Sequence, residues 1–460
     1  NENRKVIIDA GHGGPEPGAV YNGRKEKNDT LRLAFDLGSA LERRGIQVSY
    51  TRVEDVYDTP YEKAAMGNQS GADFFVSIHR NAMPVPGTGS GIENLVFSSS
   101  GTAGLLGKNI GRQLAAVGWT DLGVKERPSL VVLRRTKMPA VLVEAGFLDN
   151  EKDNAFFDAN LAATADAIAD GILETFEELE EWFKGVLIDG IIGNLSGLFD
   201  TVNTKVGEIA ADVGATPQGW NSGIFNMIHN LSESVIIPIA GAILAFVMTY
   251  ELIQMVTEKN NLHDIDTFMF FKWVFKTYAA VLIVTNTWNI VMGVFDAAQQ
   301  VVNQSAGVII GNTSIDIDSL VGDLQTSLEA MSLGGLIGLW FQSLFVGLTM
   351  NILSICIMLV VYGRMIEIYL VTSLGPIPLA TMTNGEWRNV GQNYLKSLLA
   401  LGFQAFLIMV VVGIYSVLIQ SISATGDVSG AIWLAMGYTV LLCFCLFKTS
   451  SMAKAVFSAH

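Results

Sequence analysis

Five long apolar stretches in the second half of the chain constrain its fold most. They cover about residues 234–254, 277–295, 333–362, 398–420 and 430–447. A helix needs about 20 predominantly apolar residues to cross a bilayer, and a buried helix of a soluble core uses a shorter run. Five such stretches in one half of a chain therefore predict an all-α polytopic membrane domain over residues 234–460.

A sixth apolar stretch, residues 366–382, contains Gly375-Pro376-Ile377-Pro378. Because proline breaks a helix interior, we expect this stretch to be re-entrant or interfacial. The distribution of lysine and arginine supports that interpretation. Counting 366–382 as a full crossing would place Arg388 and Lys396 on the outer side of the membrane, against their preference for the cytoplasm.

The loops predict the orientation of the membrane domain. Basic residues follow the first, third and last stretches, at Lys259, Lys272 and Lys276, at Arg364, Arg388 and Lys396, and at Lys448 and Lys454. The loop 296–330 carries only acidic charges, and 421–429 carries Asp427 alone. With five spans, this pattern predicts an N-terminus outside the membrane and a cytoplasmic C-terminus.

The chain is acidic, with a formal net charge of −15, and most of the excess lies in residues 174–460. This balance argues against direct, sequence-specific nucleic-acid binding. The three cysteines, Cys356, Cys443 and Cys445, lie in apolar stretches, where they are typical of small hydrophobic residues and imply no disulfide framework.

Three apolar runs in the first 150 residues lead to residues that bind or work with metals. Residues 6–12 end at His12, 74–79 at His79 and 140–144 at Glu144. Continuous apolar runs of this length predict strands buried on both faces, as in the parallel sheet of an α/β domain. Since ligands bind beyond the carboxyl ends of such strands, these side chains are expected at one site. Taken singly, a histidine at a strand end is more often structural.

Imidazole and carboxylate groups suit Zn²⁺, which keeps three protein ligands and one open position in catalytic sites. The most plausible third ligand is Glu26, just ahead of a helix that we expect to open at Asn28 or Asp29 and to close at Gly45. Glu144 is then left as a base. Glycines next to His12 allow backbone and substrate to approach the metal closely.

Residues 4–173 resemble the zinc-dependent N-acetylmuramoyl-L-alanine amidases of bacterial cell walls, phage endolysins and sporulation. The matching segments, in order, are Asp9-Ala10-Gly11-His12-Gly13-Gly14, Asn22-Gly23 with Glu26-Lys27, Thr51-Arg52, Ser77-Ile78-His79-Arg80-Asn81-Ala82, Gly91-Ile92-Glu93, Leu130-Val131-Val132-Leu133-Arg134 and Met138-Pro139-Ala140-Val141-Leu142-Val143-Glu144-Ala145-Gly146-Phe147.

This resemblance implies an α/β three-layer sandwich over residues 1–173, with His12, Glu26 and His79 as zinc ligands and Glu144 as the catalytic carboxylate. The implied reaction cleaves the amide between the lactyl group of N-acetylmuramic acid and L-alanine in peptidoglycan. Zinc would activate water, and Glu144 would take its proton and pass it to the leaving nitrogen. One departure from the family is Arg80, where a smaller or polar residue is common; we expect it to affect groove specificity and not the metal.

Residues 174–233 are expected to connect the two domains. Apolar residues recur at helical spacing from Phe176 to Leu187. An interfacial amphipathic helix and a plain connector packing on the amidase domain both explain this pattern.

The membrane half resembles the polytopic pore subunit of conjugative type IV secretion systems, in its Gram-positive mobile-element branch, over residues 178–460. The matching segments are Trp182-Phe183-Lys184-Gly185, Thr285-Asn286-Thr287-Trp288-Asn289-Ile290-Val291, Tyr362-Gly363-Arg364-Met365-Ile366-Glu367-Ile368-Tyr369, Leu374-Gly375-Pro376-Ile377-Pro378 and Asn393-Tyr394-Leu395-Lys396-Ser397. This resemblance implies a homo-oligomer with other secretion-channel subunits in the lipid bilayer.

The leading hypothesis is a peptidoglycan hydrolase fused to a channel subunit in the bacterial cytoplasmic membrane, with the amidase domain on the wall side. A membrane-anchored hydrolase with no transport role, or an artificial fusion, are the alternatives. The sequence begins Asn1-Glu2-Asn3-Arg4 without a methionine or an apolar leader. Export of the N-terminus then requires either a signal segment that has been removed or a chain that joins two proteins.

Overall fold

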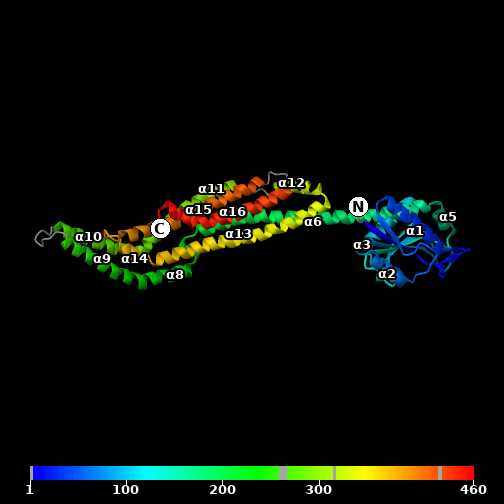
Figure 1. Cartoon of the computed structure of the whole chain (residues 1–460), viewed down its shortest axis with the longest axis horizontal. Coiled ribbons are helices and arrows are strands. Elements are labelled where there is room, and N and C mark those ends of the chain that lie inside the picture. Colours follow the sequence, from blue (N-terminus) through cyan, green and yellow to red (C-terminus); the bar gives the residue numbers. More distant parts are fainter. Residues whose placement is uncertain (1–3, 258–266, 314–316, 423–426, 460) are drawn as a thin grey trace. The chain divides into compact units, whose positions relative to one another are not determined.

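The computed structural model describes residues 4–257, 267–313, 317–422 and 427–459. Its internal contacts divide the chain into two compact units, Asn1–Phe183 and Lys184–His460. Figure 1 shows sheet and helices in the first unit and helices alone in the second. The predicted fold class, an α/β domain followed by an all-α domain, is confirmed.

The first unit is built on a six-stranded sheet with the order β4-β1-β5-β8-β6-β7. The strands are β1 (Lys5–Ala10), β4 (Gln47–Tyr50), β5 (Phe74–Asn81), β6 (Ile92–Val96), β7 (Asp121–Glu126) and β8 (Ala140–Phe147). The runs that lead to His12, His79 and Glu144 are β1, β5 and β8, and β5 pairs in parallel with both of the others.

The sheet is mixed, which differs from the parallel sheet that the apolar runs predict. β6 pairs antiparallel with β8, and β7 follows the direction of β6. The cause is the connection from β5 to β6, residues 82–91, which contains no helix. A parallel return needs a crossover of a dozen residues or more, so this short loop does not return the chain to the starting edge.

Helices cover both faces of the sheet and complete the three layers. One face packs against α1 (Glu26–Arg43), α3 (Thr102–Val117), α5 (Glu151–Ala159) and the first part of α6 (Leu161–Val213). The other face packs against α2 (Pro60–Ser70) and α4 (Val131–Arg135). A small hairpin of β2 (Val20–Tyr21) and β3 (Arg24–Lys25) leads directly into α1.

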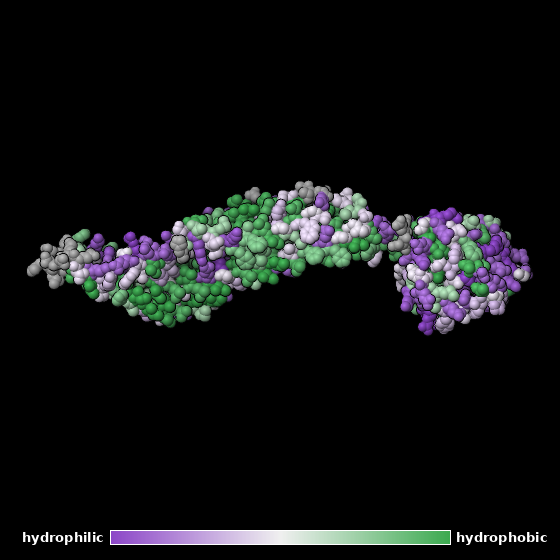
Figure 2. All heavy atoms as spheres, in the orientation of Figure 1, coloured by the Kyte–Doolittle hydropathy of each residue, from purple (hydrophilic) through white to green (hydrophobic). Residues whose placement is uncertain are grey.

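Helices are the only regular secondary structure among the described residues of the second unit. After α6 come α7 (Pro217–Trp220), α8 (Ser222–Leu231), the π-helical turn η1 (Ser232–Ile236), α9 (Ile237–Thr257), α10 (Thr267–Thr285), α11 (Thr287–Thr313), α12 (Ile317–Glu329), α13 (Leu333–Ser373), α14 (Pro376–Ala380), α15 (Arg388–Ile422) and α16 (Val428–Val456). Figure 2 shows apolar residues over much of the visible face of this unit.

Six segments among the described residues are long and apolar enough to cross a membrane. Four contain predicted spans: Ser222–Thr257, Leu333–Ser373, Arg388–Ile422 and Val428–Val456. A further segment, Leu161–Val213, has the lowest hydropathy of the six and includes residues 174–213 of the predicted connector. It is one continuous helix, whose Phe176 and Leu179 pack on the core of the first unit and whose Leu187 packs in the second.

The predicted span 277–295 is displaced, because the structure ends α10 at Thr285 and the corresponding segment is Thr267–Thr285. Asn286 alone separates α10 from the next helix, which begins at Thr287. The side-chain amide of Asn286 donates to the carbonyl of Leu282 at 2.9 Å, and the hydroxyl of Thr287 donates to that of Val284 at 2.9 Å.

The stretch 366–382 contains the end of α13, which stops at Ser373. Gly375 and Pro376 begin a separate short helix, α14, so the helix breaks where these residues predict it.

Candidate metal centre

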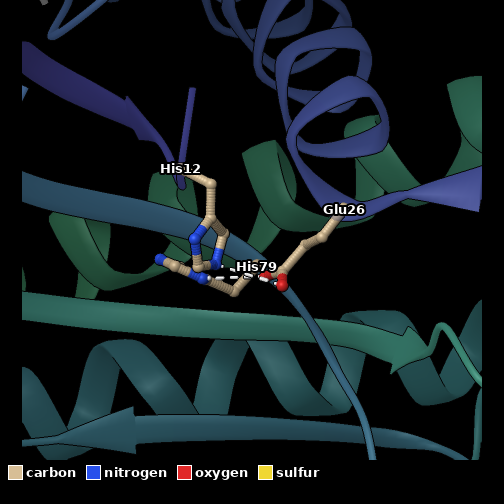
Figure 3. Close-up of side chains that lie close together, drawn as sticks. All are labelled: His12, Glu26 and His79. Atoms are coloured by element: carbon tan, nitrogen blue, oxygen red, sulfur yellow. Dashed lines mark hydrogen bonds and ion pairs between the residues drawn. The ribbon is translucent and has the colours of Figure 1, made fainter. Parts of the chain in front are cut away.

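Three of the predicted site residues meet at one edge of the sheet (Figure 3). His12 follows β1 in a left-handed backbone conformation, with φ of 61°. His79 lies in β5 near its carboxyl end. Glu26 is the first residue of α1, so the helix opens two to three residues earlier than Asn28 or Asp29. The reason is the β2–β3 hairpin, which delivers the chain to the helix at Lys25.

The possible ligand atoms of His12, Glu26 and His79 all lie within 4.8 Å of one another. Nε2 of His12 is 3.1 Å from Oε2 of Glu26, and Nδ1 of His79 is 2.9 Å from Oε1 of the same carboxylate. The two imidazoles stand edge to face, with ring centroids 4.8 Å apart. Two nitrogens and one carboxylate at this spacing could hold a metal ion, and they match the donor types that Zn²⁺ prefers.

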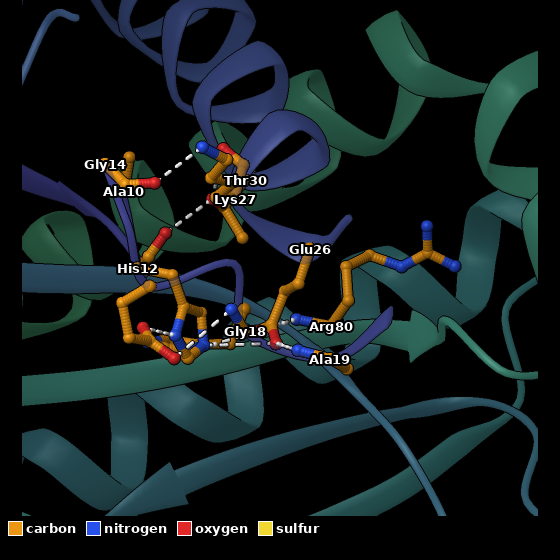
Figure 4. Close-up of polar contacts among 12 residues, drawn as sticks. Ala10, His12, Gly14, Gly18, Ala19, Glu26, Lys27, Thr30 and Arg80 are labelled. Atoms are coloured by element: carbon orange, nitrogen blue, oxygen red, sulfur yellow. Dashed lines mark hydrogen bonds and ion pairs between the residues drawn. The ribbon is translucent and has the colours of Figure 1, made fainter. Parts of the chain in front are cut away.

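The site is only partly open to solvent. The side chain of Glu26 is 5% exposed, whereas those of His12 and His79 are 22% and 19% exposed. Burial alone would raise the pKa of Glu26, but hydrogen bonds from His12 and His79 hold it well below its usual range. The carboxylate also accepts backbone N–H groups of Ala19 at 2.9 Å and Arg80 at 3.0 Å (Figure 4). Glu26 is therefore an oriented anion.

Glu16 is a neighbour of the site that the sequence reasoning missed. Its carboxylate pairs with Nδ1 of His12, the ring nitrogen that faces away from Glu26. The hydrogen bonds to Glu26 and Glu16 outweigh burial and raise the pKa of His12. The spacing of four residues between His12 and Glu16 was the available signal. A carboxylate on the second nitrogen of an imidazole fixes its tautomer and orientation, as is common around protein metal sites.

Glu144 lies on β8, directly opposite His79 on β5. On its other side it faces Glu93 of β6. Its Oε2 atom is buried and has no hydrogen-bond partner among the described residues. Burial, reinforced by the charges of Glu26 and Glu93, raises the pKa of Glu144 to about 7. Glu144 thus stands beside the His12–Glu26–His79 cluster as a separate carboxyl group.

Two glycines make room for the cluster. A Cβ atom on Gly11 would collide with the imidazole of His79. One on Gly18, whose φ is +67°, would lie 2.5 Å from Oε2 of Glu26 and 2.6 Å from the ring of His12. These contacts are shorter than real Cβ atoms make, so both positions need glycine.

Buried side-chain hydrogen-bond donors fix the main chain just before His12. Lys63 donates to the carbonyl of Ala10 at 2.8 Å, and Arg52 donates to the carbonyls of Ala10 and Gly11 at 3.0 Å each. Asp9 pairs with Lys63 at 2.8 Å, and this pairing holds the pKa of Asp9 below its usual value despite complete burial. The conformation of the His12 loop therefore rests on a closed polar network.

Arg80 does not line the site, which corrects the expectation that it affects groove specificity. Its side chain is fully buried and pairs with Asp29 at 2.7 Å. The guanidinium also lies over the ring of Phe157, 4.3 Å from its centroid. Side chains alternate between the two faces of a strand, so the residue after His79 points into the protein instead.

The fold and this cluster define the first unit as an α/β domain with a His-Glu-His site of metal-binding geometry. Residues 6–174 match the family model of N-acetylmuramoyl-L-alanine amidase. Residues 202–376 match the model of TrbL/VirB6 plasmid conjugal transfer like protein, a shorter range than the predicted 178–460.

Individual relatives match the first unit. The chain is 37% identical to the sporulation-specific N-acetylmuramoyl-L-alanine amidase of Bacillus subtilis, over 32% of this chain and 58% of the relative. It is 38% identical to the endolysin of Bacillus phage SPP1, over 37% of this chain and 65% of the relative. The crystal structure of N-acetylmuramoyl-L-alanine amidase from Clostridium difficile 630 is 31% identical, covering 38% of this chain and 98% of that one, with a TM-score of 0.37.

The first unit is thus similar to N-acetylmuramoyl-L-alanine amidases over residues 6–174. It spans 58% and 65% of the length of the first two relatives. The predicted family resemblances of both halves are confirmed.

Proposed function

We propose that the first unit is a zinc-dependent hydrolase that cleaves the amide between N-acetylmuramic acid and L-alanine in peptidoglycan. The observation that carries the proposal is the convergence of His12, Glu26 and His79 beside the carboxyl group of Glu144, whose Oε2 atom has no hydrogen-bond partner among the described residues. The family match of residues 6–174 supports the substrate, since the matching relatives are named for this amide bond or for lysis.

In this proposal, His12, Glu26 and His79 hold the metal, with Glu16 keeping the imidazole of His12 in place. Zinc bound there would supply Lewis-acid polarisation of the amide carbonyl and a lower pKa for water. Glu144 takes the proton of the attacking water on a carboxylate oxygen and passes it to the amide nitrogen as the carbon–nitrogen bond breaks. Water thereby ends on the lactyl carbonyl carbon, and the stem peptide leaves with a free amine.

Incubation of the purified full-length chain with peptidoglycan tests the assignment. We expect zinc-dependent release of peptides that begin with L-alanine, together with new carboxyl groups on muramic acid. Release of reducing sugars instead would mean that a glycosidic bond is cut, and the proposed reaction would be wrong.

We propose that the second unit is a subunit of a conjugation channel in the bacterial cytoplasmic membrane. Its family match and its apolar helices support this function. Homo-oligomers, partner subunits, a wall-side amidase domain and a cytoplasmic C-terminus belong to the same proposal. The last two require that α6 does not cross the bilayer, and its low hydropathy compared with the other segments favours this.

A further inference from the structure

Arg80 joins the two elements that carry His79 and Glu26. It follows His79 on β5, and Figure 4 shows its side chain directed away from His12. Nη1 donates to Asp29 at 2.7 Å, and Nη2 donates to the side-chain carbonyl of Asn154 at 2.8 Å. The guanidinium is thus held on the far side of the strand from the metal-binding atoms.

Asp29 is the partner of Arg80 on α1. It lies three residues after Glu26 in the first turn of the helix, and its side chain is 4% exposed. Arg24 donates to both of its oxygens, at 2.6 and 3.1 Å. One buried carboxylate therefore ties Arg80 of β5 to the start of α1 and to the hairpin that precedes it.

The same two elements also meet at the ligand atoms. The backbone N–H of Arg80 and the ring of His79 both contact Oε1 of Glu26, at 3.0 and 2.9 Å. Arg80 comes one residue after His79, and Asp29 comes three residues after Glu26. The ion pair between Arg80 and Asp29 therefore joins the neighbours of both possible ligands. A change in the spacing between β5 and α1 would therefore move Glu26 relative to His79.

We propose that Arg80 and Asp29 are positioning residues, which hold the β5 and α1 parts of the metal site at binding distance. The inference rests on the proposed metal site. Stability alone does not account for such a pair, because apolar residues of similar volume often replace buried ion pairs at no loss. Residues that orient metal ligands typically contribute about 10- to 100-fold to metal affinity.

Zinc affinity of the full-length chain, measured by competition with a chromophoric chelator, tests this role. We expect Arg80→Met to weaken zinc binding about 10- to 100-fold. Asp29 keeps Arg24 as a partner in this variant, so no bare charge is left buried. Arg80→Lys keeps the charge but loses the two-pronged contact to Asp29 and Asn154. Arg80→Lys should also weaken zinc binding, and this variant replaces Arg80→Met in the test if Arg80→Met does not fold.

The matched control is Arg44→Met. Arg44 pairs with Asp166 and Asp170 at 3.0 and 2.8 Å, at the opposite end of α1 from Glu26. This variant should lose an ion pair of α1 and still bind zinc as the wild type does. In the Co²⁺-loaded chain, the visible absorption bands should change in Arg80→Met and not in Arg44→Met, because these bands report ligand geometry.

Wild-type zinc affinity in Arg80→Met, or an equal loss in Arg44→Met, would overturn the positioning role. Failure of the wild type to bind zinc would instead overturn the proposed metal site, so the two failures are distinguishable.

Discussion

His79 and Glu144 lie directly opposite each other on the neighbouring parallel strands β5 and β8. Their register places a possible metal ligand beside a carboxyl group whose Oε2 atom has no hydrogen-bond partner in the described part of the chain, and Glu93 of β6 continues the row. Because both residues occupy rigid central strands, their separation does not depend on loop conformation. This arrangement allows separate roles for two acidic residues at one site, Glu26 in binding and Glu144 in proton transfer.

The division of roles predicts different outcomes for two substitutions. Glu144→Gln keeps the shape of the side chain but accepts no proton, so turnover should fall by about 10²- to 10⁴-fold while zinc stays bound. His79→Ala should lose both zinc and activity. Metal analysis and peptide release measure the two properties, and equal zinc loss in both variants would mean that the roles are misassigned.

The glycine at position 18 should be required for metal binding. In Gly18→Ala, the new methyl group would displace Glu26 or His12, and zinc affinity should fall at least about tenfold, the lower end for perturbed ligand orientation. Gly23→Ala is the matched control, since Gly23 also has a positive φ, of 81°, but no atom lies within 4 Å of the added Cβ. An equal loss of zinc affinity in both variants would show that backbone strain, and not the contact, governs position 18, and wild-type affinity in Gly18→Ala would contradict the prediction.

The stability of the metal-free chain should depend on pH through Glu144. Its folded-state pKa of about 7 lies above the ordinary value of 4.5, so folding favours the protonated form. This contribution is fully present below pH 4.5 and is lost as the pH rises through about 7. It amounts to about 3 kcal/mol.

Pulse proteolysis in urea at pH 5 and pH 8 measures this dependence. Glu144→Gln should lose less stability than the wild type between these two values. His12, whose pKa is also raised, contributes a pH dependence of the same sign to both proteins, so their difference isolates Glu144. Parallel curves for the two proteins would show that Glu144 titrates normally.

Single cysteines should report the orientation of the membrane domain. In a chain with Cys356, Cys443 and Cys445 replaced, Ser100→Cys on the first unit should react with a membrane-impermeant thiol reagent in intact cells. Ser451→Cys in α16 should not react. Both side chains are exposed in the structure. Labelling of Ser451→Cys alone would place the amidase domain in the cytoplasm and reverse the predicted orientation. Labelling of both positions, or of neither, would put the two ends on the same side of the membrane and would favour a crossing by α6.

The two halves should act together during transfer. A tethered hydrolase has a high effective concentration only within reach of its tether. We therefore expect Glu144→Gln to reduce conjugative transfer across intact wall without changing membrane insertion, and enzymatic removal of the wall should restore transfer. Normal transfer by this variant in walled cells that lack another hydrolase would support the anchored-hydrolase or artificial-fusion alternative.

Local sequence patterns were sufficient for the three strands β1, β5 and β8, for most membrane segments and for the meeting of His12, Glu26 and His79. Burial on two faces leaves a continuous apolar run, and strand direction places the ends of parallel strands at one edge. Such patterns do not specify the direction in which the next strand joins the sheet. β6 is antiparallel to β8 because the connection from β5 to β6 contains no helix. They also gave no account of α6 as one continuous helix.

The surroundings of the site depended on the tertiary structure. The sequence by itself determined that Arg80 follows His79, but only the packing of β5 against α1 decided that its guanidinium lies buried on Asp29. In the same way, only the turn between His12 and Glu16 brings the carboxylate of Glu16 to the imidazole of His12. The physical reason is that periodicity reports whether a residue is buried, whereas its partners are set by register and by contacts between residues distant in the chain.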